Sequence, residues 1–331
     1  MNKPENLNHK SKIIDSHTHV GISINNYLAT ASYPYAMTVE DLIVRMDFLG
    51  IEKSVVFPFE SSYYPLLGEE KVLDSPAMST FPYEKENENL LREIYDIFPE
   101  YSERLVPFMM FDPSRETEKQ AEHLGELRKK YKIFGLKTVT TYIKAFAADF
   151  GNDENHTRNF AIEHKLPITF HCSWDENDIW ANVFDILDVV EKNPTLKFCL
   201  AHTARFSREA LKRADILPNC FVDTSAFKIH CELATQNSTT VADPEKRFVA
   251  DYSAPEKVLQ ALSEAYPNTI IWGSDTPYHN FAQKHINAKG ELIDCKLRAN
   301  YDDEINILNT LPENLIEKIS YVNTLKFLDA D

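Results

Sequence analysis

The sequence predicts an α/β fold in which parallel strands close into a barrel, and three observations support this prediction. Eight short apolar runs alternate with amphipathic segments of helical periodicity along the 331 residues. The runs are almost continuously hydrophobic, as expected for parallel strands covered on both faces. Polar side chains follow several runs at their carboxyl ends. These ends meet at one mouth in a barrel, whereas a doubly wound sheet would spread them along a line, so the barrel is favoured.

Each element follows from its local pattern. Thr38 and the acidic residues after it indicate a helix start, and Gly50 indicates the end of the same helix. The predicted strands cover residues 12–20, 53–59, 104–113, 133–139, 167–172, 197–204, 220–227 and 269–277. The predicted helices cover residues 39–50, 87–98, 117–131, 157–165, 177–193, 207–214 and 254–266, followed by two C-terminal helices at roughly 303–311 and 313–329.

The chain contains no linker, repeat or low-complexity segment, so we expect a single domain over residues 1–331. Two insertions interrupt the alternation, at about 60–86 after the second strand and 228–253 after the seventh. Both leave the barrel on the side of its mouth. They are candidates for a lid or for a contact between copies in a homo-oligomer.

Composition narrows the classes of partner and location. The formal net charge of -16 argues against nucleic acid and against an anionic membrane surface, which leaves a small molecule as the expected substrate. No apolar run approaches the roughly 20 residues of a membrane helix, and residues 1–12 lack the apolar core of a secretory signal, so a cytoplasmic location is expected. Five scattered cysteines without CxxC spacing suggest neither a disulfide framework nor a cysteine-type zinc site.

The sharpest local signal is Asp15-Ser16-His17-Thr18-His19 at the end of the first apolar run. Residues two apart in a strand point to the same side, so both imidazoles can face the barrel centre. Imidazole is a good ligand for zinc and similar cations. A pair of this kind also occurs by chance on surfaces, but its position at a strand end favours a metal site.

Further candidates end other strands. His171 ends the fifth run, His202 the sixth and Asp275 the eighth. A lone histidine in such a place is more often a core histidine bonded to backbone, and a lone aspartate often caps a turn. Together with His17 and His19, however, they form a plausible ligand set. Three imidazoles and one carboxylate leave a position for water, whose pKa zinc lowers to about 7.

Five segments together resemble the amidohydrolase superfamily: DSHTHVG, FHC, LAHTARF, IIWGSDTPY and the terminal ENLIEKISYVNTLKFL. The resemblance is strongest to the branch typified by aminocarboxymuconate-semialdehyde decarboxylase and runs in order from Ile13 to Leu328. It implies a distorted (β/α)₈ TIM barrel of the metal-dependent hydrolase type. It also implies one divalent ion, with zinc favoured and manganese the alternative, bound by four side chains: His17, His19, His171 and Asp275. His202 would be the histidine that transfers a proton and contacts water or substrate.

Lys137, at the end of the fourth strand, leaves two alternatives open. In binuclear members of the superfamily a lysine here is carbamylated and bridges a second metal. In the branch that the sequence most resembles, one ion is usual, and Lys137 would meet a substrate carboxylate or carbonyl.

Arg205 could clamp an anionic group or be a surface arginine. Trp174 could line the pocket or belong to an ordinary loop.

Other residues near the strand ends carry weaker expectations. Asp223 resembles a family position that supports the site by hydrogen bonds. Lys228 and His230 follow it and are candidates for substrate contact. His279, in the loop after Asp275, is expected to be exposed.

The function predicted first is a hydrolase in which metal-activated water attacks a small lactone, amide or ester, often carboxylated, with Asp275 or His202 taking the proton. The second keeps the site but removes CO₂ from an unsaturated or aromatic carboxylic acid. The alternative from another functional class is a non-catalytic or metal-independent barrel that binds a ligand. A non-catalytic barrel predicts that a ligand position is missing, and all four are present, so an enzyme is favoured.

Overall fold

The structure is a computed structural model that describes residues 12–23, 27, 33–59, 79–286 and 292–329. Most of the insertion predicted at 60–86 therefore lies outside the described residues, whereas the insertion at 228–253 lies within them. Within the described ranges, every helix is too short or too polar to traverse a bilayer.

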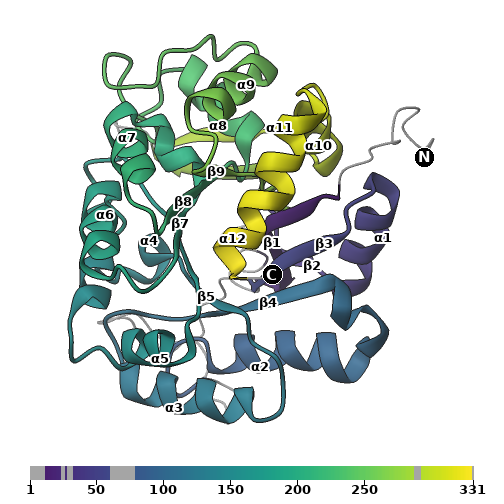
Figure 1. The fold of residues 1–331 in the computed structure, drawn as a ribbon, viewed down its shortest axis with the longest axis vertical. Coiled ribbons are helices and arrows are strands. Elements are labelled where there is room, and N and C mark those ends of the chain that lie inside the picture. Colours follow the sequence, from purple (N-terminus) through teal and green to yellow (C-terminus); the bar gives the residue numbers. More distant parts are fainter. Residues whose placement is uncertain (1–11, 24–26, 28–32, 60–78, 287–291, 330–331) are drawn as a thin grey trace.

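Parallel strands form the centre of the molecule, in the order in which they occur along the chain (Figure 1). Neighbouring strands pair in parallel from β1 through β9, and the short β2 adds antiparallel to the end of β1. The strands are β1 (Ile14–Ile22), β2 (Ala36–Met37), β3 (Lys53–Pro58), β4 (Leu105–Met110), β5 (Gly135–Thr138), β6 (Ile168–Phe170), β7 (Phe198–Leu200), β8 (Cys220–Asp223) and β9 (Ile270–Ile271).

The last strand meets the first, which closes the sheet. Ser16 N donates to Trp272 O at 3.1 Å, Asp275 N donates to His17 O at 2.8 Å, and His19 N donates to Thr276 O at 2.8 Å. The barrel is distorted, because β9 has two residues while β1 has nine, and the register of β1 shifts between Asp15 and Thr18. The predicted fold is confirmed.

Helices surround the strands. They are α1 (Val39–Leu49), α2 (Glu84–Arg92), α3 (Thr117–Arg128), α4 (Thr140–Ile143), α5 (His156–His164), α6 (Val183–Lys192), α7 (Arg208–Ile216), α8 (Phe227–Thr235), α9 (Pro255–Ala265), α10 (Tyr301–Leu308), α11 (Glu313–Glu317) and α12 (Asn323–Leu328). In α1 the predicted signals are visible: Thr38 Oγ1 accepts from Asp41 N at 3.0 Å, and Gly50 ends the helix at φ 72°. The buried apolar residues of the helices belong to the same core clusters as those of the strands.

Some boundaries differ from the prediction. Helix α6 begins six residues later than expected, because Asn182 caps it through Phe184 N and residues 174–181 form a loop. The C-terminal segment predicted as one helix is α11 and α12 joined by a wider turn at Lys318–Val322. Phe327 of α12 packs against Phe108 and Phe221 of the barrel strands.

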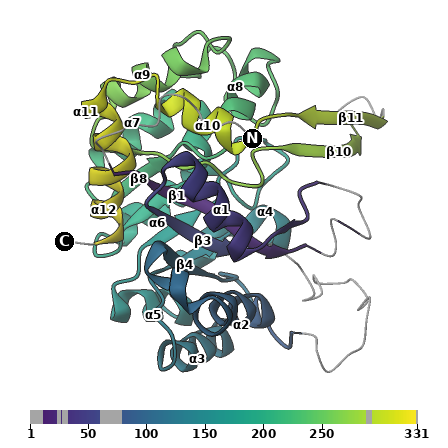
Figure 2. The same cartoon turned by 90° about the vertical axis from the view of Figure 1, so that its right-hand side faces the viewer.

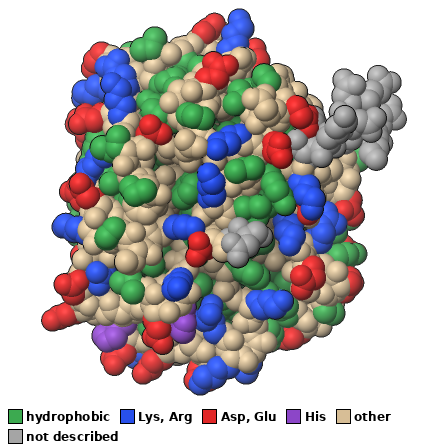
Figure 3. Space-filling model, viewed as in Figure 1, with side chains coloured by type: hydrophobic (Ala, Val, Ile, Leu, Met, Phe, Trp, Pro, Cys, Tyr) green, Lys and Arg blue, Asp and Glu red, His purple; other side chains and the backbone are tan. Residues whose placement is uncertain are grey.

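An antiparallel hairpin, β10 (Phe281–Ile286) and β11 (Leu292–Leu297), was not predicted and projects from the barrel in Figure 2. On the face shown in Figure 3, Lys and Arg side chains are interspersed with Asp and Glu, and apolar side chains form small separate groups.

Candidate active site

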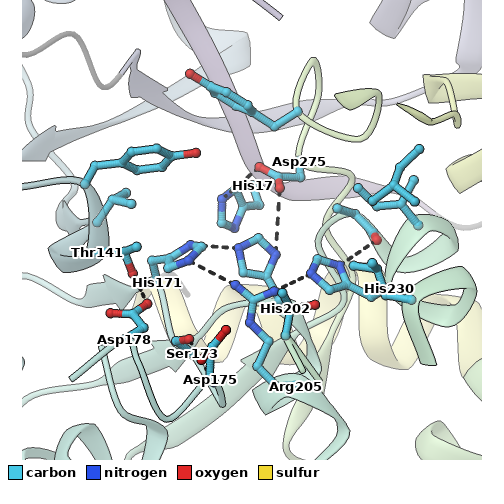
Figure 4. A pocket seen from close by; sticks show the side chains of 18 of the residues that line it. His17, Thr141, His171, Ser173, Asp175, Asp178, His202, Arg205, His230 and Asp275 are labelled. Atoms are coloured by element: carbon cyan, nitrogen blue, oxygen red, sulfur yellow. Dashed lines mark hydrogen bonds and ion pairs between the residues drawn. The ribbon is translucent and has the colours of Figure 1, made fainter. Parts of the chain in front are cut away.

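A cavity of about 520 Å³ opens at the carboxyl ends of the strands, within the size range of small-molecule sites (Figure 4). Most residues predicted to be functional line it. These are His17, His19, Lys137, His171, His202, Arg205 and Asp275, and His230 is also present. One part of the wall is apolar and comes from Val139, Ile229, Leu233 and Leu297.

Three ligand atoms converge at the base of this cavity. His17 Nε2 and His19 Nε2 lie 3.3 Å apart, and each lies 3.3 Å from Asp275 Oδ1. A tetrahedral ion with ligand bonds of about 2.0–2.1 Å requires ligand atoms about 3.3 Å apart, so the triangle has the size that zinc needs. Within the described part of the chain, these three residues form the group suited to hold a metal ion.

The tautomers of both histidines also fit a cation. His17 Nδ1 lies 2.8 Å from Asp223 Oδ2, and His19 Nδ1 lies 3.3 Å from Pro58 O. Because these oxygens can only accept, each Nδ1 carries the proton and each Nε2 presents a lone pair. Two lone pairs and a carboxylate oxygen therefore face one point. A positive charge there would satisfy all three.

Burial and nearby charges keep His17 neutral and Asp223 ionised. Burial, with Lys137 nearby, lowers the pKa of His17, so its imidazole stays neutral. Burial alone would raise the pKa of Asp223, but His17, Lys137 and a hydrogen bond from Ser225 hold it below its usual value. Asp223 therefore stays ionised behind the histidine, which is the arrangement that orients metal-ligating histidines in general. The expectation that Asp223 supports the site by hydrogen bonds is confirmed.

Two strands must approach closely to bring the ligands together. Gly273 lies where an added Cβ would come within 2.8 Å of His17 Cβ and of Ser16 Oγ. Asp15 Oδ1 accepts from both His17 N and Ser274 N at 3.0 Å, and Asp15 Oδ2 accepts from Tyr301 at 2.6 Å. A buried carboxylate thus joins β1 to the segment that carries Asp275.

Asp275 is buried and has a positive φ of 63°. Burial raises its pKa to about 6, although His17 and Lys137 favour its ionised form. Its second oxygen, Oδ2, lies 3.7 Å from His202 Nδ1. A carboxylate of this kind is basic enough to accept a proton near neutral pH.

A second group contains His171, His202, Arg205 and His230, joined by the dashed lines in Figure 4. His202 Nε2 lies 2.9 Å from His171 Nδ1. Arg205 Nη2 donates to His171 Nε2 at 3.0 Å, and Arg205 Nη1 donates to His230 Nε2 at 2.5 Å. His171 thus points to His202 and Arg205 and is not among the three converging ligands.

A left-handed turn presents two of these side chains. Five consecutive non-glycine residues, His202 to Phe206, have φ between 47° and 60°. Such residues cost roughly 1–2 kcal/mol each, so the turn requires compensation. The insertion at 228–253 supplies part of it, since Ala242 N donates to Arg205 O at 2.9 Å and Phe248 N to Phe206 O at 2.8 Å. Since a turn of three residues returns to the same face, His202 and Arg205 point into one cavity.

The chain matches the model of a known protein family. The family model described as Amidohydrolase matches residues 72–330. The chain belongs to the amidohydrolase family. It is therefore an enzyme, of a family that is typically metal-dependent. No curated protein matches this amidohydrolase.

Three solved structures share its fold. An amidohydrolase from Burkholderia multivorans with bound HEPES is 15% identical, with a TM-score of 0.60 over 97% of this chain and 100% of that one. Dihydroorotase from Campylobacter jejuni is 14% identical, with a TM-score of 0.51 over 97% of this chain and 84% of that one. IDCase from Metarhizium anisopliae is 13% identical, with a TM-score of 0.50 over 96% of this chain and 97% of that one.

In this amidohydrolase Lys137 is 1% exposed, and its ammonium lies 3.3 Å from His17 Nε2 and 5.0 Å from the centre of the Phe57 ring. It can therefore donate to a lone pair that an ion would also use. Arg205 is 8% exposed, so the alternative of a surface arginine is wrong.

Two expectations need correction: that Trp174 lines the pocket and that His279 is exposed. Trp174 does not belong to the described lining of the cavity; its ring packs against Phe184, whereas Ser173 and Asp175 on either side line the cavity. Successive residues of an extended segment point in opposite directions, which explains the difference. His279 is buried against Tyr301 and not exposed.

Lys228 and His230, the two other candidates for substrate contact, lie in different places relative to the cavity. Lys228 pairs with Asp303 at 2.8 Å and lies outside the described cavity lining, whereas His230 lines it. Sequence reasoning missed Thr141 and Asp178, which are hydrogen-bonded at 2.6 Å in the cavity wall. Thr141 comes just after the predicted strand 133–139, which was the available signal, whereas Asp178 falls within the segment predicted as helix 177–193.

Proposed function

We propose that this amidohydrolase is a metal-dependent hydrolase that uses water to open a small lactone, amide or ester carrying a carboxylate. One observation carries the proposal: two imidazole lone pairs and the Asp275 carboxylate converge in a cavity that also holds two buried cations, Lys137 and Arg205. A bound divalent ion would lower the pKa of a water molecule and polarise the substrate carbonyl. Zinc is favoured by the donor set, and manganese is the alternative.

The residues of the chain divide the remaining work. His17, His19 and Asp275 would hold the ion. Asp275 Oδ1 lies with the two imidazole lone pairs, and its second oxygen, Oδ2, would accept a proton from the attacking water. The ring of His202, with Nδ1 3.7 Å from Asp275 Oδ2, lies beside this carboxylate and would contact water or substrate.

The cations select the substrate. Arg205 presents a planar set of donors suited to a carboxylate, and Lys137 presents a compact charge near the ion-binding cluster. The Lys137 ammonium lies 3.3 Å from His17 Nε2, and with this lone pair used for an ion it would donate to the substrate carbonyl or carboxylate instead. A second ion bridged by a carbamylated Lys137 is the alternative for a binuclear site.

The same two cations favour a second candidate, decarboxylation, because they could hold a carboxylate as the reacting group beside the ion. The solved structures do not separate the two reactions, since identities of 13–15% show the fold alone. A cytoplasmic location and a homo-oligomer remain predictions from the sequence.

Ion content and turnover test the proposal together. Protein purified without chelator should contain about one zinc or manganese per chain by plasma mass spectrometry and should hydrolyse members of a panel of carboxylated lactones, amides and esters. Asp275→Asn should reduce turnover by about 10²- to 10⁴-fold, while the surface variant Asp188→Asn should match the wild type. Wild-type turnover by Asp275→Asn would contradict the assignment. Release of CO₂ from unsaturated or aromatic acids without hydrolysis would favour the second candidate, and two ions would favour the carbamate.

A further inference from the structure

Helix α8 turns one of its faces toward the cavity. Four residues on this face line the cavity: Ala226 at the N-cap, then Ile229, His230 and Leu233. Residues three and four apart lie on the same side of a helix, so the four side chains form one continuous surface. His230 Nε2 accepts from Arg205 Nη1 at 2.5 Å, which places this surface beside a buried cation. Apart from His230, the surface is aliphatic.

The hairpin of β10 and β11 extends the aliphatic surface. Leu297, the last residue of β11, lines the cavity and belongs to a small core cluster with Ala226 and Ile229, against which Leu233 packs. Figure 2 shows the hairpin beside α8. Ile229, Leu233 and Leu297 thus form an aliphatic strip along one wall of the cavity. The reaction proposed above uses neither the hairpin nor this strip.

A different part of the wall is polar. Figure 4 shows Thr141 and Asp178 there, on the far side of the cavity from His230. Asp178 Oδ2 accepts from Thr141 Oγ1 at 2.6 Å, and the carboxylate of Asp175 also lines the cavity. An apolar group placed against these carboxylates would remove water from charged groups, which is costly. The same group placed against the aliphatic strip would release water from apolar surface, which is favourable.

We propose that the aliphatic strip is a subsite for an alkyl or aryl group of the substrate. The substrate then combines three features: a hydrolysable carbonyl, a carboxylate and an apolar group. A cavity of about 520 Å³ has room for all three. Because the strip adjoins Arg205, the carbon chain of a carboxylate held by Arg205 can extend along Ile229 and Leu233. This subsite belongs to the reaction proposed above and rests on it, but it determines which substrates are preferred.

Binding of butanoate, hexanoate and octanoate to the full chain as purified, measured by isothermal titration calorimetry, tests the subsite. The Kd should fall by about threefold or more for each added methylene group, because each one buries apolar surface on the strip. In Leu233→Asn, which keeps the size of the side chain but makes it polar, the gain should drop below about twofold for each methylene. Leu297→Ala should also reduce the gain.

Ile216→Asn is the matched control. Ile216 lies at the exposed end of α7, outside the described lining of the cavity, and is 77% exposed. This variant should show the same gain for each methylene group as the wild type. A Kd independent of chain length in the wild type, or an equal gain in Leu233→Asn and Ile216→Asn, would overturn the inference. Circular dichroism identifies a variant that fails to fold, and Leu233→Ala then replaces Leu233→Asn.

Turnover separates this inference from the proposed function. Among carboxylated lactones, kcat/KM should rise from methyl-substituted to butyl-substituted members, and Leu233→Asn should remove most of that rise. Hydrolysis without any dependence on the apolar group would overturn the subsite alone. A dependence of acid binding on chain length, without hydrolysis of any lactone, amide or ester in the panel, would contradict the proposed reaction and leave the apolar subsite standing.

Discussion

At the scale of single residues, the ion-binding cluster depends on hydrogen bonds made behind it. Asp223 fixes the tautomer of His17, and Pro58 O does the same for His19. Asp223 also accepts from His202 N at 3.0 Å and from Ser225, so one carboxylate orients two histidines. The ligands are thus positioned before any ion arrives, which lowers the cost of binding it.

Asp223→Asn should therefore weaken zinc binding by about 10- to 100-fold, because it removes the negative charge behind His17 and leaves one accepting oxygen where Asp223 uses two, one for His17 and one for His202 N and Ser225. Chelator competition on the metal-free protein measures the change. Asp188→Asn, on the exposed side of α6, serves as the matched control and should bind zinc like the wild type. Equal affinity for Asp223→Asn and the control would show that Asp223 has no orienting role.

At the scale of elements, helix ends and strand contacts follow local chemistry. Helix α1 begins at a threonine cap and ends at a glycine in the left-handed region, with its apolar face on the barrel. The contact between β1 and the segment after β9 has a stricter requirement, since Gly273 leaves no space for a side chain. The first feature stabilises one helix, whereas the second closes the sheet and assembles the ligands.

Gly50→Ala should reduce the free energy of unfolding by about 1 kcal/mol, because alanine is strained at a positive φ. Denaturant titration measures the loss. Val44→Ala, at an exposed position of the same helix, should stay within about 0.5 kcal/mol of the wild type. Equal stability of Gly50→Ala and wild type would mean that the helix ends differently.

Gly273→Ala should have a larger effect, about 1–3 kcal/mol of stability, together with weaker zinc binding. The added methyl group would push β1 away from the segment that carries Asp275. Gly125→Ala, whose new Cβ would meet no atom closer than 4.0 Å, is the matched control and should bind zinc normally. Unchanged zinc affinity in Gly273→Ala would show that the close contact at Gly273 does not determine where the ion ligands lie.

At the scale of the whole molecule, the C-terminal helices are tied to the barrel through buried polar groups. Tyr301 of α10 donates to Asp15 beneath the ion-binding cluster. Glu304 of the same helix accepts from Lys228 N at 3.1 Å, at the start of α8, while its Oε2 has no hydrogen-bond partner among the described residues. Burial raises the pKa of Glu304 well above its usual value, so its neutral form is favoured in the folded state.

A carboxyl group with a raised folded pKa stabilises the fold below its unfolded pKa of about 4.5, and this contribution is lost as the pH rises through the folded value. Glu304→Gln cannot ionise and should therefore gain stability relative to wild type as the pH rises from about 5 to 8. Melting temperatures of both proteins across this range give the difference. A difference independent of pH would show that Glu304 ionises in the fold as easily as in the unfolded chain.

The sequence by itself determined the fold class, most helices and strands, and the residues at the mouth of the barrel. Hydrophobic periodicity and helix-end residues act locally, so they can be read along the chain, and a chemically capable side chain after an apolar run marks a strand end. The sequence also indicated that Asp223 would support the site. These features needed no knowledge of which strands become neighbours.

Only the tertiary structure decided how the candidate residues are grouped. His17, His19 and Asp275 form one cluster and His171, His202 and Arg205 another, because strand closure and a left-handed turn set distances that spacing does not encode. The outward packing of Trp174 and the burial of His279 depend likewise on contacts between distant segments. Hydrogen-bond donors and acceptors far apart in the chain choose their partners only once the barrel has closed.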